Sequence, residues 1–397
     1  MDSPQPQPAG DVAAASVARP GYLAELDGLR ALAIALVMAF HLWDYRGANA
    51  VGRAANVIAR QGWVGVDVFF ALSGFLITRI LLASRESPHY YGSFYVRRAL
   101  RIFPLYYAVL GVLLAVGLLA ASRGIGLGDL TPHQLSYIWI NALYLSNFAL
   151  AFLRSNVIPL DISWSLAVEE QFYLVYPWVV RRLSRTALER WLVVAIVVAV
   201  PLRWISFRWF PGNHYGPYVL PYCRMDALAV GCLAALVLQR QDGTAARWMA
   251  KAALPLWLLA AAVAFTWHRG QLTFVLLGYA LTAAATAGTI VRLQLGEWTG
   301  VARVLRARAL VAVGKVSYGL YLLHLLVRVA IDRLPWFGVE QRQSLLLAVV
   351  RVVVIAGVSL GAAWCSWLLF EKPILGLKDR LDPAAARRRA PAPPSTT

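Results

Sequence analysis

The sequence predicts an all-α fold, a polytopic membrane protein built as a bundle of about ten transmembrane helices. Hydrophobic residues make up 59% of the 397 residues, charged residues make up only 15%, and the mean hydropathy is +0.59. Soluble globular chains normally carry about 25% charged residues. Apolar segments long enough to cross a bilayer recur along the chain, and no polar stretch between them is long enough to bury a core of its own.

Eleven hydrophobic segments follow one another, but the charges of the loops fit ten crossings. Cytoplasmic loops carry an excess of Lys and Arg, and eleven crossings would place the last four basic loops opposite the first. The conflict disappears if one of the adjacent segments 135–153 and 164–182 is re-entrant or interfacial, and the sequence leaves open which one. Both termini then lie in the cytoplasm. The segments are residues 29–47, 63–83, 103–121, 135–153, 164–182, 189–207, 222–239, 252–268, 272–292, 311–331 and 345–369.

The two ends of the chain differ in composition from the membrane region. Residues 1–21 are rich in Pro, Gln and Ala and predict a disordered tail, and residues 376–397 predict a basic, Pro/Ala-rich cytoplasmic tail. Residues 22–375 form one membrane domain between them. The net charge of +18 is ascribed to basic loops beside anionic headgroups, so nucleic acid is not an expected partner. Three scattered cysteines show no metal-ligand spacing, and no metal is expected.

Arg30 and His41 share an otherwise apolar first segment. Eleven residues of α-helix return almost to the starting azimuth, so the two side chains lie on one face, roughly 16 Å apart along the axis. A lone histidine in a membrane helix is either a hydrogen-bond partner of another helix or a functional group, and the cost of burying it favours function. Arg98 and Arg101, three residues apart, share a face that suits bidentate binding of a phosphate, although arginines at the end of a span also snorkel to the interface.

The predicted topology places further polar residues in the outer layer of the membrane together with His41. Asp67, Arg224, Asp226 and His324 belong to this layer, and His41 and Asp67 are expected to lie close enough to meet. For Asp67 and for the Arg224/Asp226 pair, internal charge pairing that fixes the bundle explains the residues as well as catalysis does.

Six segments in order along the chain resemble motifs of the membrane-bound acyltransferase-3 family, the bacterial peptidoglycan and lipopolysaccharide O-acetylase type. They cover about residues 22–375. The segments are residues 25–78 with Arg30, His41 and Gly65-Val-Asp-Val-Phe, residues 95–106 with Arg98-x-x-Arg101, residues 163–177 with Trp164-Ser-Leu-x-x-Glu169, residues 224–231, residues 314–324 and residues 370–373.

The resemblance implies a bacterial cytoplasmic membrane enzyme that transfers an acyl group from acyl-CoA, most often acetyl-CoA, to a hydroxyl. The implied acceptor is a carbohydrate, an envelope glycan or a glycosylated metabolite. Joined to the residues, it predicts that Arg30, Arg98 and Arg101 bind the coenzyme's phosphates. His41 then acts as general base or carries the acyl group itself, two roles that the sequence leaves open.

Two parts of this scheme depend on groups other than His41. Asp67 or Glu169 is expected to orient the imidazole, and an arginine or a backbone N–H to stabilise the oxyanion. The rival interpretation is a transporter of an acyl or glycan precursor, since ionisable residues also line transport paths. Transporter halves tend to repeat, and neither the Arg30/His41 element nor the Glu169 element has a second copy in the sequence.

Overall fold

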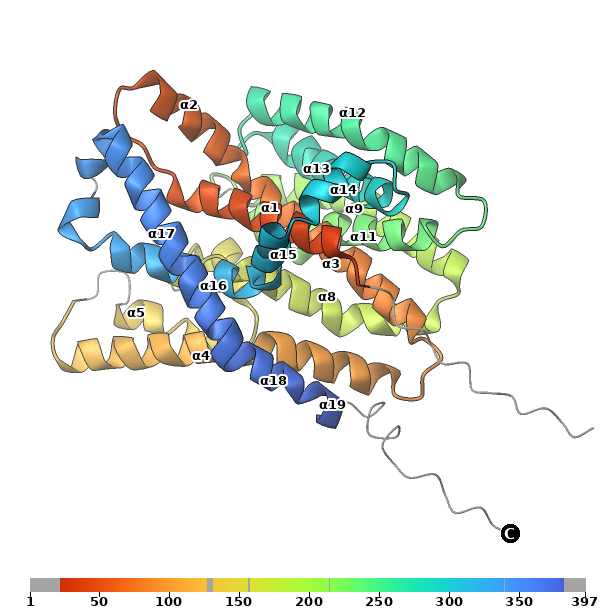
Figure 1. Cartoon of the computed structure of the whole chain (residues 1–397), viewed down its shortest axis with the longest axis horizontal. Helices are drawn as coiled ribbons and strands as arrows, with labels where there is room; N and C mark the ends of the chain where they lie inside the picture. The colour runs from red at the N-terminus through yellow and green to blue at the C-terminus, as the bar shows by residue number, and fades with distance from the viewer. Residues whose placement is uncertain (1–21, 127–130, 156–157, 214, 339, 382–397) are drawn as a thin grey trace, which may run out of the picture.

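The computed structural model describes residues 22–126, 131–155, 158–213, 215–338 and 340–381, and every regular element in them is helical (Figure 1). The all-α prediction is therefore confirmed. The predicted tail at residues 1–21 lies outside the described residues. Of the predicted tail at 376–397, residues Lys378–Leu381 form α19, and residues 382–397 lie outside the described part.

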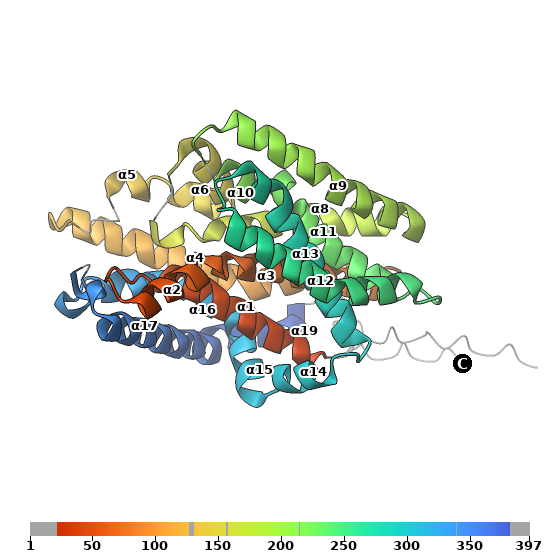
Figure 2. The same ribbon diagram turned by 90° about the horizontal axis from the view of Figure 1, so that it is seen from above.

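Long helices make up the body of the molecule, and most of them run alongside one another in both views (Figures 1 and 2). Among the described residues, seven helices are long and apolar enough to cross a membrane, or up to eight if one bent pair counts as a single span. The polytopic bundle is confirmed, and the count of about ten crossings stays a prediction. The long helices are α1 (Ala24–Leu42), α3 (Val64–Ala83), α4 (Tyr90–Ser122), α8 (Ser163–Arg182), α9 (Arg185–Trp209), α11 (Pro221–Val237), α12 (Thr244–Thr266), α13 (Leu272–Gln294), α16 (Ser317–Ile331) and α17 (Leu345–Ser366).

Shorter helices connect the long ones. Asn49 is the N-cap of α2, the helix that precedes η1 and α3, and its side chain accepts hydrogen bonds from the N–H groups of Val51 and Gly52. Short elements outside the region of residues 131–155 are α2 (Ala50–Ala59), η1 (Arg60–Trp63), η3 (Ile158–Leu160), α10 (Gly216–Val219), α14 (Thr299–Leu305), α15 (Arg308–Lys315), η4 (Pro335–Phe337), η5 (Glu340–Gln343), η6 (Trp367–Glu371) and α18 (Lys372–Gly376).

The two segments between which the sequence could not choose differ in the structure. Residues 163–182 form the unbroken helix α8, whereas the region of 135–153 is divided into short pieces. Polar side chains attach these pieces to α8: Ser163 Oγ donates to Asn141 Oδ1 at 2.9 Å, and Gln171 Nε2 donates to the Tyr144 carbonyl at 2.8 Å. Irregular backbone at membrane depth is tolerated where protein surrounds it. The pieces are α5 (Pro132–Leu135), α6 (Ile138–Ala142), α7 (Ser146–Phe148) and η2 (Ala149–Leu153).

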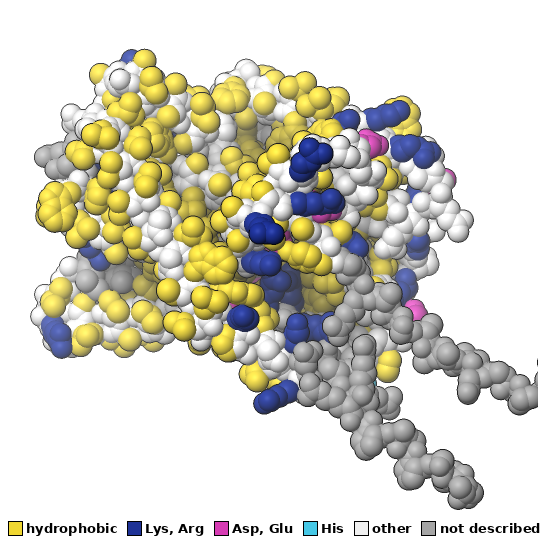
Figure 3. Space-filling model, in the orientation of Figure 1, with side chains coloured by type: hydrophobic (Ala, Val, Ile, Leu, Met, Phe, Trp, Pro, Cys, Tyr) yellow, Lys and Arg dark blue, Asp and Glu magenta, His cyan; other side chains and the backbone are white. Residues whose placement is uncertain are grey.

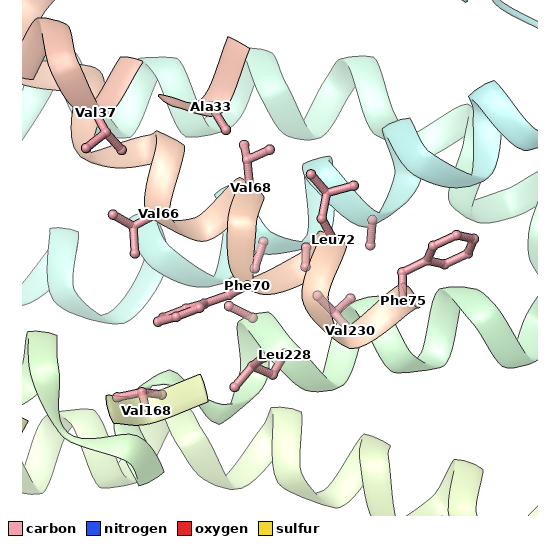
Figure 4. Packing of buried hydrophobic residues seen from close by; sticks show 14 of the residues in the cluster. Ala33, Val37, Val66, Val68, Phe70, Leu72, Phe75, Val168, Leu228 and Val230 are labelled. Atoms are coloured by element: carbon pink, nitrogen blue, oxygen red, sulfur yellow. The ribbon is translucent and has the colours of Figure 1, made fainter. Parts of the chain in front are cut away.

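Helix α3 lies in the middle of the main hydrophobic core, between α1 and α11 (Figure 4). The contact between α3 and α11 is close because each helix places a glycine against the other's backbone. A Cβ added at Gly74 would collide with the Leu228 carbonyl oxygen, and one added at Gly231 would collide with that of Ala71. Small residues allow membrane helices to approach in this way. Polar side chains near the start of α3 and α11 are thereby brought within bonding distance.

Helix α16 reaches α1 because the chain bends by 71° between α15 and α16. Both α15 and α16 pack against α1. The sequence predicts one span over 311–331, and the structure shows that this region is bent at Val316. The bend sets the direction of α16, which carries its middle turns past the C-terminal end of α1.

Basic side chains gather around α14 and α15 on the face shown in Figure 3, while the opposite end of this face is largely apolar. Arg303, Arg306, Arg308 and Lys315 are exposed there. A basic end fits the loop charges from which the topology was predicted. That this end faces the cytoplasm stays a prediction.

Candidate active site

His41 and His324 form a hydrogen-bonded pair of imidazoles. His41 lies in the last turn of α1, and its Nδ1 is 3.0 Å from Nε2 of His324 on α16. His324 is completely buried, whereas His41 is partly exposed. The backbone carbonyl of His41 accepts a hydrogen bond from Nη1 of Arg328 at 2.8 Å. The sequence placed both histidines in one layer, and the structure brings them into contact.

Backbone carbonyls fix the tautomers of this pair when both rings are neutral. Nδ1 of His324 is 2.7 Å from the carbonyl oxygen of Tyr321, and because a carbonyl only accepts, this nitrogen carries the proton. Nε2 of His324 is then an acceptor, so Nδ1 of His41 must be the donor in the bond between the rings. The lone pair of His41 is consequently left on Nε2. A neutral imidazole with this tautomer is a ready proton acceptor.

A large cavity, the His41 cavity, opens beside this ring. Its volume is about 1420 Å³, above the roughly 300–1,000 Å³ of typical small-molecule sites. Aromatic side chains and arginines share its walls. Its lining includes Phe40, His41, Arg60, Arg154, Asp161 and Arg269.

A smaller cavity of about 110 Å³, the Arg98 cavity, lies toward the N-terminal end of α1. The three arginines predicted to bind phosphate line it. Arg30 comes from α1, and Arg98 and Arg101 come from α4. Glu169 of α8 lines the same cavity, so three guanidinium groups face one carboxylate. Val66 and Tyr321 line both cavities, which therefore adjoin at these two side chains.

The arginines of the Arg98 cavity differ in how they are held. Arg30 donates to Asp27 Oδ1 at 2.6 Å. The Arg98 guanidinium carbon lies 4.1 Å from the centroid of the Tyr173 ring, which orients the side chain by stacking. Among the described residues neither Arg98 nor Arg101 forms an ion pair, and Arg101 is exposed. Two cationic groups are thus available to an anionic ligand.

Asp67, Arg224 and Asp226 form buried ion pairs between helices. Asp67 on α3 pairs with Arg224 on α11, and Asp226 accepts from Nη1 of Arg203 on α9 at 2.6 Å. All four side chains are buried. The Arg224 guanidinium also stacks on Tyr279, at 4.3 Å from the ring centroid. These contacts favour the interpretation in which the charges fix the bundle, because a buried charge without its partner is costly.

The side chain that is hydrogen-bonded to the His41 ring is neither Asp67 nor Glu169, the two residues that the sequence predicted for this role. His324 occupies that place, Asp67 is directed toward α11, and Glu169 lines the Arg98 cavity. The cause is the helix arrangement: the close α3–α11 crossing pairs Asp67 with Arg224, and the bend before α16 delivers His324. No group of three or more His, Cys, Asp or Glu side chains in the described part of the chain is arranged to hold a metal ion.

The family model described as "Acyltransferase domain" matches residues 23–370, a range that contains both cavities and the histidine pair. The chain belongs to the acyltransferase-3 family. This membership favours the acyltransferase interpretation over the transporter. No solved structure matches the chain.

Curated relatives of this acyltransferase-3 chain carry O-acetyltransferase names. It is 31% identical to the peptidoglycan O-acetyltransferase OatA of Listeria monocytogenes, over 48% of the chain and 30% of the relative. It is 28% identical to the putative peptidoglycan O-acetyltransferase YrhL of Bacillus subtilis, over 89% of the chain and 55% of the relative. A putative O-acetyltransferase of Staphylococcus aureus is 26% identical, over 77% of the chain and 50% of the relative. The chain thus spans about half or less of the length of these relatives.

Several residues of the candidate site were not found from the sequence. Tyr321 lies in the segment 314–324 that resembles a family motif, so that motif was an available signal for it. Its hydroxyl is 2.7 Å from Ser165 Oγ and 2.9 Å from the Ile162 carbonyl, which fixes the ring at the junction of the cavities. Asp161 and Arg269 lie in connections between helices, where neither periodicity nor spacing distinguishes a functional side chain from a solvated one.

Proposed function

We propose that this chain is a membrane O-acyltransferase that moves an acyl group, most often acetyl, from coenzyme A to a hydroxyl of a carbohydrate. The observation that carries the proposal is the pair of adjoining cavities, one with three arginines and one with the paired histidines. In this arrangement the arginines match the charged end of an acyl donor, and the path toward His41 matches its long uncharged arm. Family membership and the names of the relatives support the reaction class.

The donor binds with its phosphates in the Arg98 cavity. Arg98 and Arg101 supply guanidinium groups, which match phosphate oxygens by bidentate, charge-assisted hydrogen bonds, and Arg30 adds a third positive charge. The pantetheine arm then extends along α1 past Val66 and Tyr321. Eleven residues of helix separate Arg30 from His41, a rise of roughly 16 Å, so an extended arm is required to bring the thioester to the ring.

His41 acts as the general base in this mechanism. Its Nε2 accepts the proton of the acceptor hydroxyl while the hydroxyl oxygen attacks the thioester carbonyl carbon. The tetrahedral intermediate collapses by breaking the carbon–sulfur bond, and the leaving thiolate takes the proton from Nε2 of the imidazolium. The products are the O-acyl ester and free coenzyme A, and His41 returns to its starting tautomer. Direct transfer is favoured over a transiently acylated His41 because the His41 cavity adjoins the Arg98 cavity at Val66 and Tyr321, so that donor and acceptor can be bound at the same time.

Transfer of label from acetyl-CoA tests the proposed reaction. The protein in nanodiscs should consume [¹⁴C]acetyl-CoA and place alkali-labile label on purified peptidoglycan fragments, the acceptor class that the names of two relatives suggest. Coenzyme A release is followed with a thiol reagent, and the glycan is recovered and counted. Empty nanodiscs serve as the control. If coenzyme A is not released and the glycan stays unlabelled, the proposed function is wrong.

His324 should act through His41, as a positioning residue. We expect His324→Leu to lower kcat about 100-fold, within the range that general-base catalysis supplies, because His41 loses the acceptor that holds its proton on Nδ1. His324→Gln should restore most of the rate, since its amide oxygen can accept the same hydrogen bond. The measurement is kcat against pH for both variants, with thermal unfolding recorded alongside. Equal losses in the two variants would contradict the positioning role.

A further inference from the structure

The walls of the His41 cavity carry an excess of positive charge. Among the described residues that line it are five arginines and two aspartates. Arg60 lies at the end of α2, Arg154 follows η2, and Arg269 lies between α12 and α13, so separate parts of the chain contribute the charge. Like charges gathered around one space repel one another unless an anion enters it.

The two aspartates contribute little negative charge to this space. Asp332 accepts hydrogen bonds from Arg351 at 2.6 Å and 2.8 Å and is 3.2 Å from Nη2 of Arg342. Asp161 lies in the turn before α8, and its Oδ1 is buried without a hydrogen-bond partner in the described structure. Burial raises the pKa of Asp161 to about 7, so near neutral pH a large fraction of this carboxyl is uncharged. Asp332 also pairs with the cavity arginine Arg328 at 3.5 Å, whereas Arg60, Arg154 and Arg269 have no carboxylate partner among the described residues, so the cavity keeps an excess of positive charge.

Two of the cavity arginines, Arg269 and Arg328, lie close to His41. The Arg269 guanidinium carbon is 4.6 Å from the centroid of the Phe40 ring, and the same ring lies against His41 with 5.0 Å between ring centroids. Arg60 and Arg154 are exposed to solvent. Arg154 has a backbone φ of 54°, a left-handed conformation that is uncommon for a residue other than glycine. A ligand that reaches His41 through the cavity therefore meets guanidinium groups.

We propose that the acceptor bound in the His41 cavity is an anionic glycan, a carbohydrate with a carboxylate or phosphate group close to the hydroxyl that is acylated. This inference rests on the proposed function, because it assigns the cavity to the acceptor. Guanidinium groups bind carboxylate and phosphate through paired hydrogen bonds. The volume of about 1420 Å³ leaves room for more than one sugar ring beside the thioester.

Binding of a matched acid and ester tests the inference. The probes are the disaccharide of N-acetylglucosamine and N-acetylmuramic acid, with its lactyl carboxylate free, and the methyl ester of the same disaccharide. Equilibrium dialysis uses the protein in nanodiscs of zwitterionic lipid at low salt. We expect the acid to bind about tenfold more tightly than the ester, the effect of one favourable charge-assisted contact. Raised salt should reduce this preference.

Single substitutions locate the preference in the cavity. Arg269→Gln and Arg60→Gln should each lower the preference for the acid, with little change for the ester, and Asp161→Asn should change the preference little. Arg53→Gln is the matched control, because Arg53 is exposed on α2 and lies outside the cavity walls. Near-equal binding of acid and ester, or no saturable binding of the acid, would overturn the inference.

Anionic lipid competes with the glycan for the same positive charge, and nanodiscs that contain it show which of the two the cavity binds. If such lipid displaces the acid, the charge serves the membrane and the inference is wrong. Unchanged binding of the acid in anionic lipid supports the glycan. The acetyl-CoA assay on the same preparation distinguishes the two proposals. Transfer of label with equal binding of acid and ester removes only this inference, whereas loss of all acetyl-CoA consumption removes the proposed function.

Discussion

His41→Ala should lower acyl transfer by about 10²- to 10⁴-fold, the contribution of a positioned general base. The substitution removes Nε2 of His41, the proposed proton acceptor. The hydrogen bond to His324 holds the lone pair on this nitrogen, and the His41 side chain lines the cavity. The affinity for coenzyme A should change little, because the proposed phosphate site lies toward the other end of α1. Single-turnover transfer from [¹⁴C]acetyl-CoA gives the rate, and equilibrium dialysis with coenzyme A gives the affinity.

A histidine that lines neither cavity provides the control for this experiment. His133→Ala, on α5, should keep the rate of the unsubstituted protein. Unchanged transfer in His41→Ala would contradict the catalytic assignment. Mass spectrometry of the intact protein after incubation with acetyl-CoA alone separates the two roles that an imidazole can have. An acetylated His41 that disappears when acceptor is added would replace the general base by a nucleophile.

The sequence predicted best those features that depend on one helix. Arg30 and His41 lie on α1, so the helical period alone fixes their relation, and each lines one of two adjoining cavities along that helix. Arg98 and Arg101 are likewise a local pair on α4. Hydropathy located most of the long helices for the same reason, since it averages over residues that are neighbours in the chain.

Contacts between helices could not be predicted in the same way. The pairing of Asp67 with Arg224 depends on the close approach of α3 and α11, and that of His41 with His324 depends on the bend before α16. Neither the crossing nor the bend leaves a periodic signal in the sequence. The sequence therefore placed these residues in one layer of the membrane, but the partner it assigned to the His41 ring, Asp67 or Glu169, is not the one that the structure shows.

Segment 135–153 shows a second limit of hydropathy. Its mean composition is apolar, yet Asn141, Ser146 and Asn147 are completely buried within it. The side chain of Gln171 on α8 donates to the Tyr144 carbonyl, a backbone group that a continuous helix would satisfy internally. A window average does not distinguish this arrangement from a crossing. Charge counting narrowed the choice to two segments, and which of them fails to cross stays open.

Removing the positive charge of the Arg98 cavity should have the other large effect. We expect the double substitution Arg98→Gln and Arg101→Gln to weaken coenzyme A binding by about 10²- to 10³-fold. Each lost charge-assisted hydrogen bond costs roughly 1.5–3 kcal/mol, and solvent access to Arg101 brings the sum toward the lower end. The affinity is measured by equilibrium dialysis, and kcat at saturating donor should fall far less than kcat/KM.

A donor without phosphates makes this experiment specific for the proposed contact. S-acetylpantetheine carries the same thioester and arm, so its kcat/KM should be nearly equal in the double variant and in the unsubstituted protein. Arg303→Gln, an exposed arginine on α14 outside the Arg98 cavity, is the matched control for a general loss of basic charge. If the double variant lost as much activity with S-acetylpantetheine as with acetyl-CoA, the arginines would act on the arm or on the fold, not on the phosphates. Retained affinity for coenzyme A would remove the phosphate site from the Arg98 cavity altogether, and the donor would then have to reach His41 by another route.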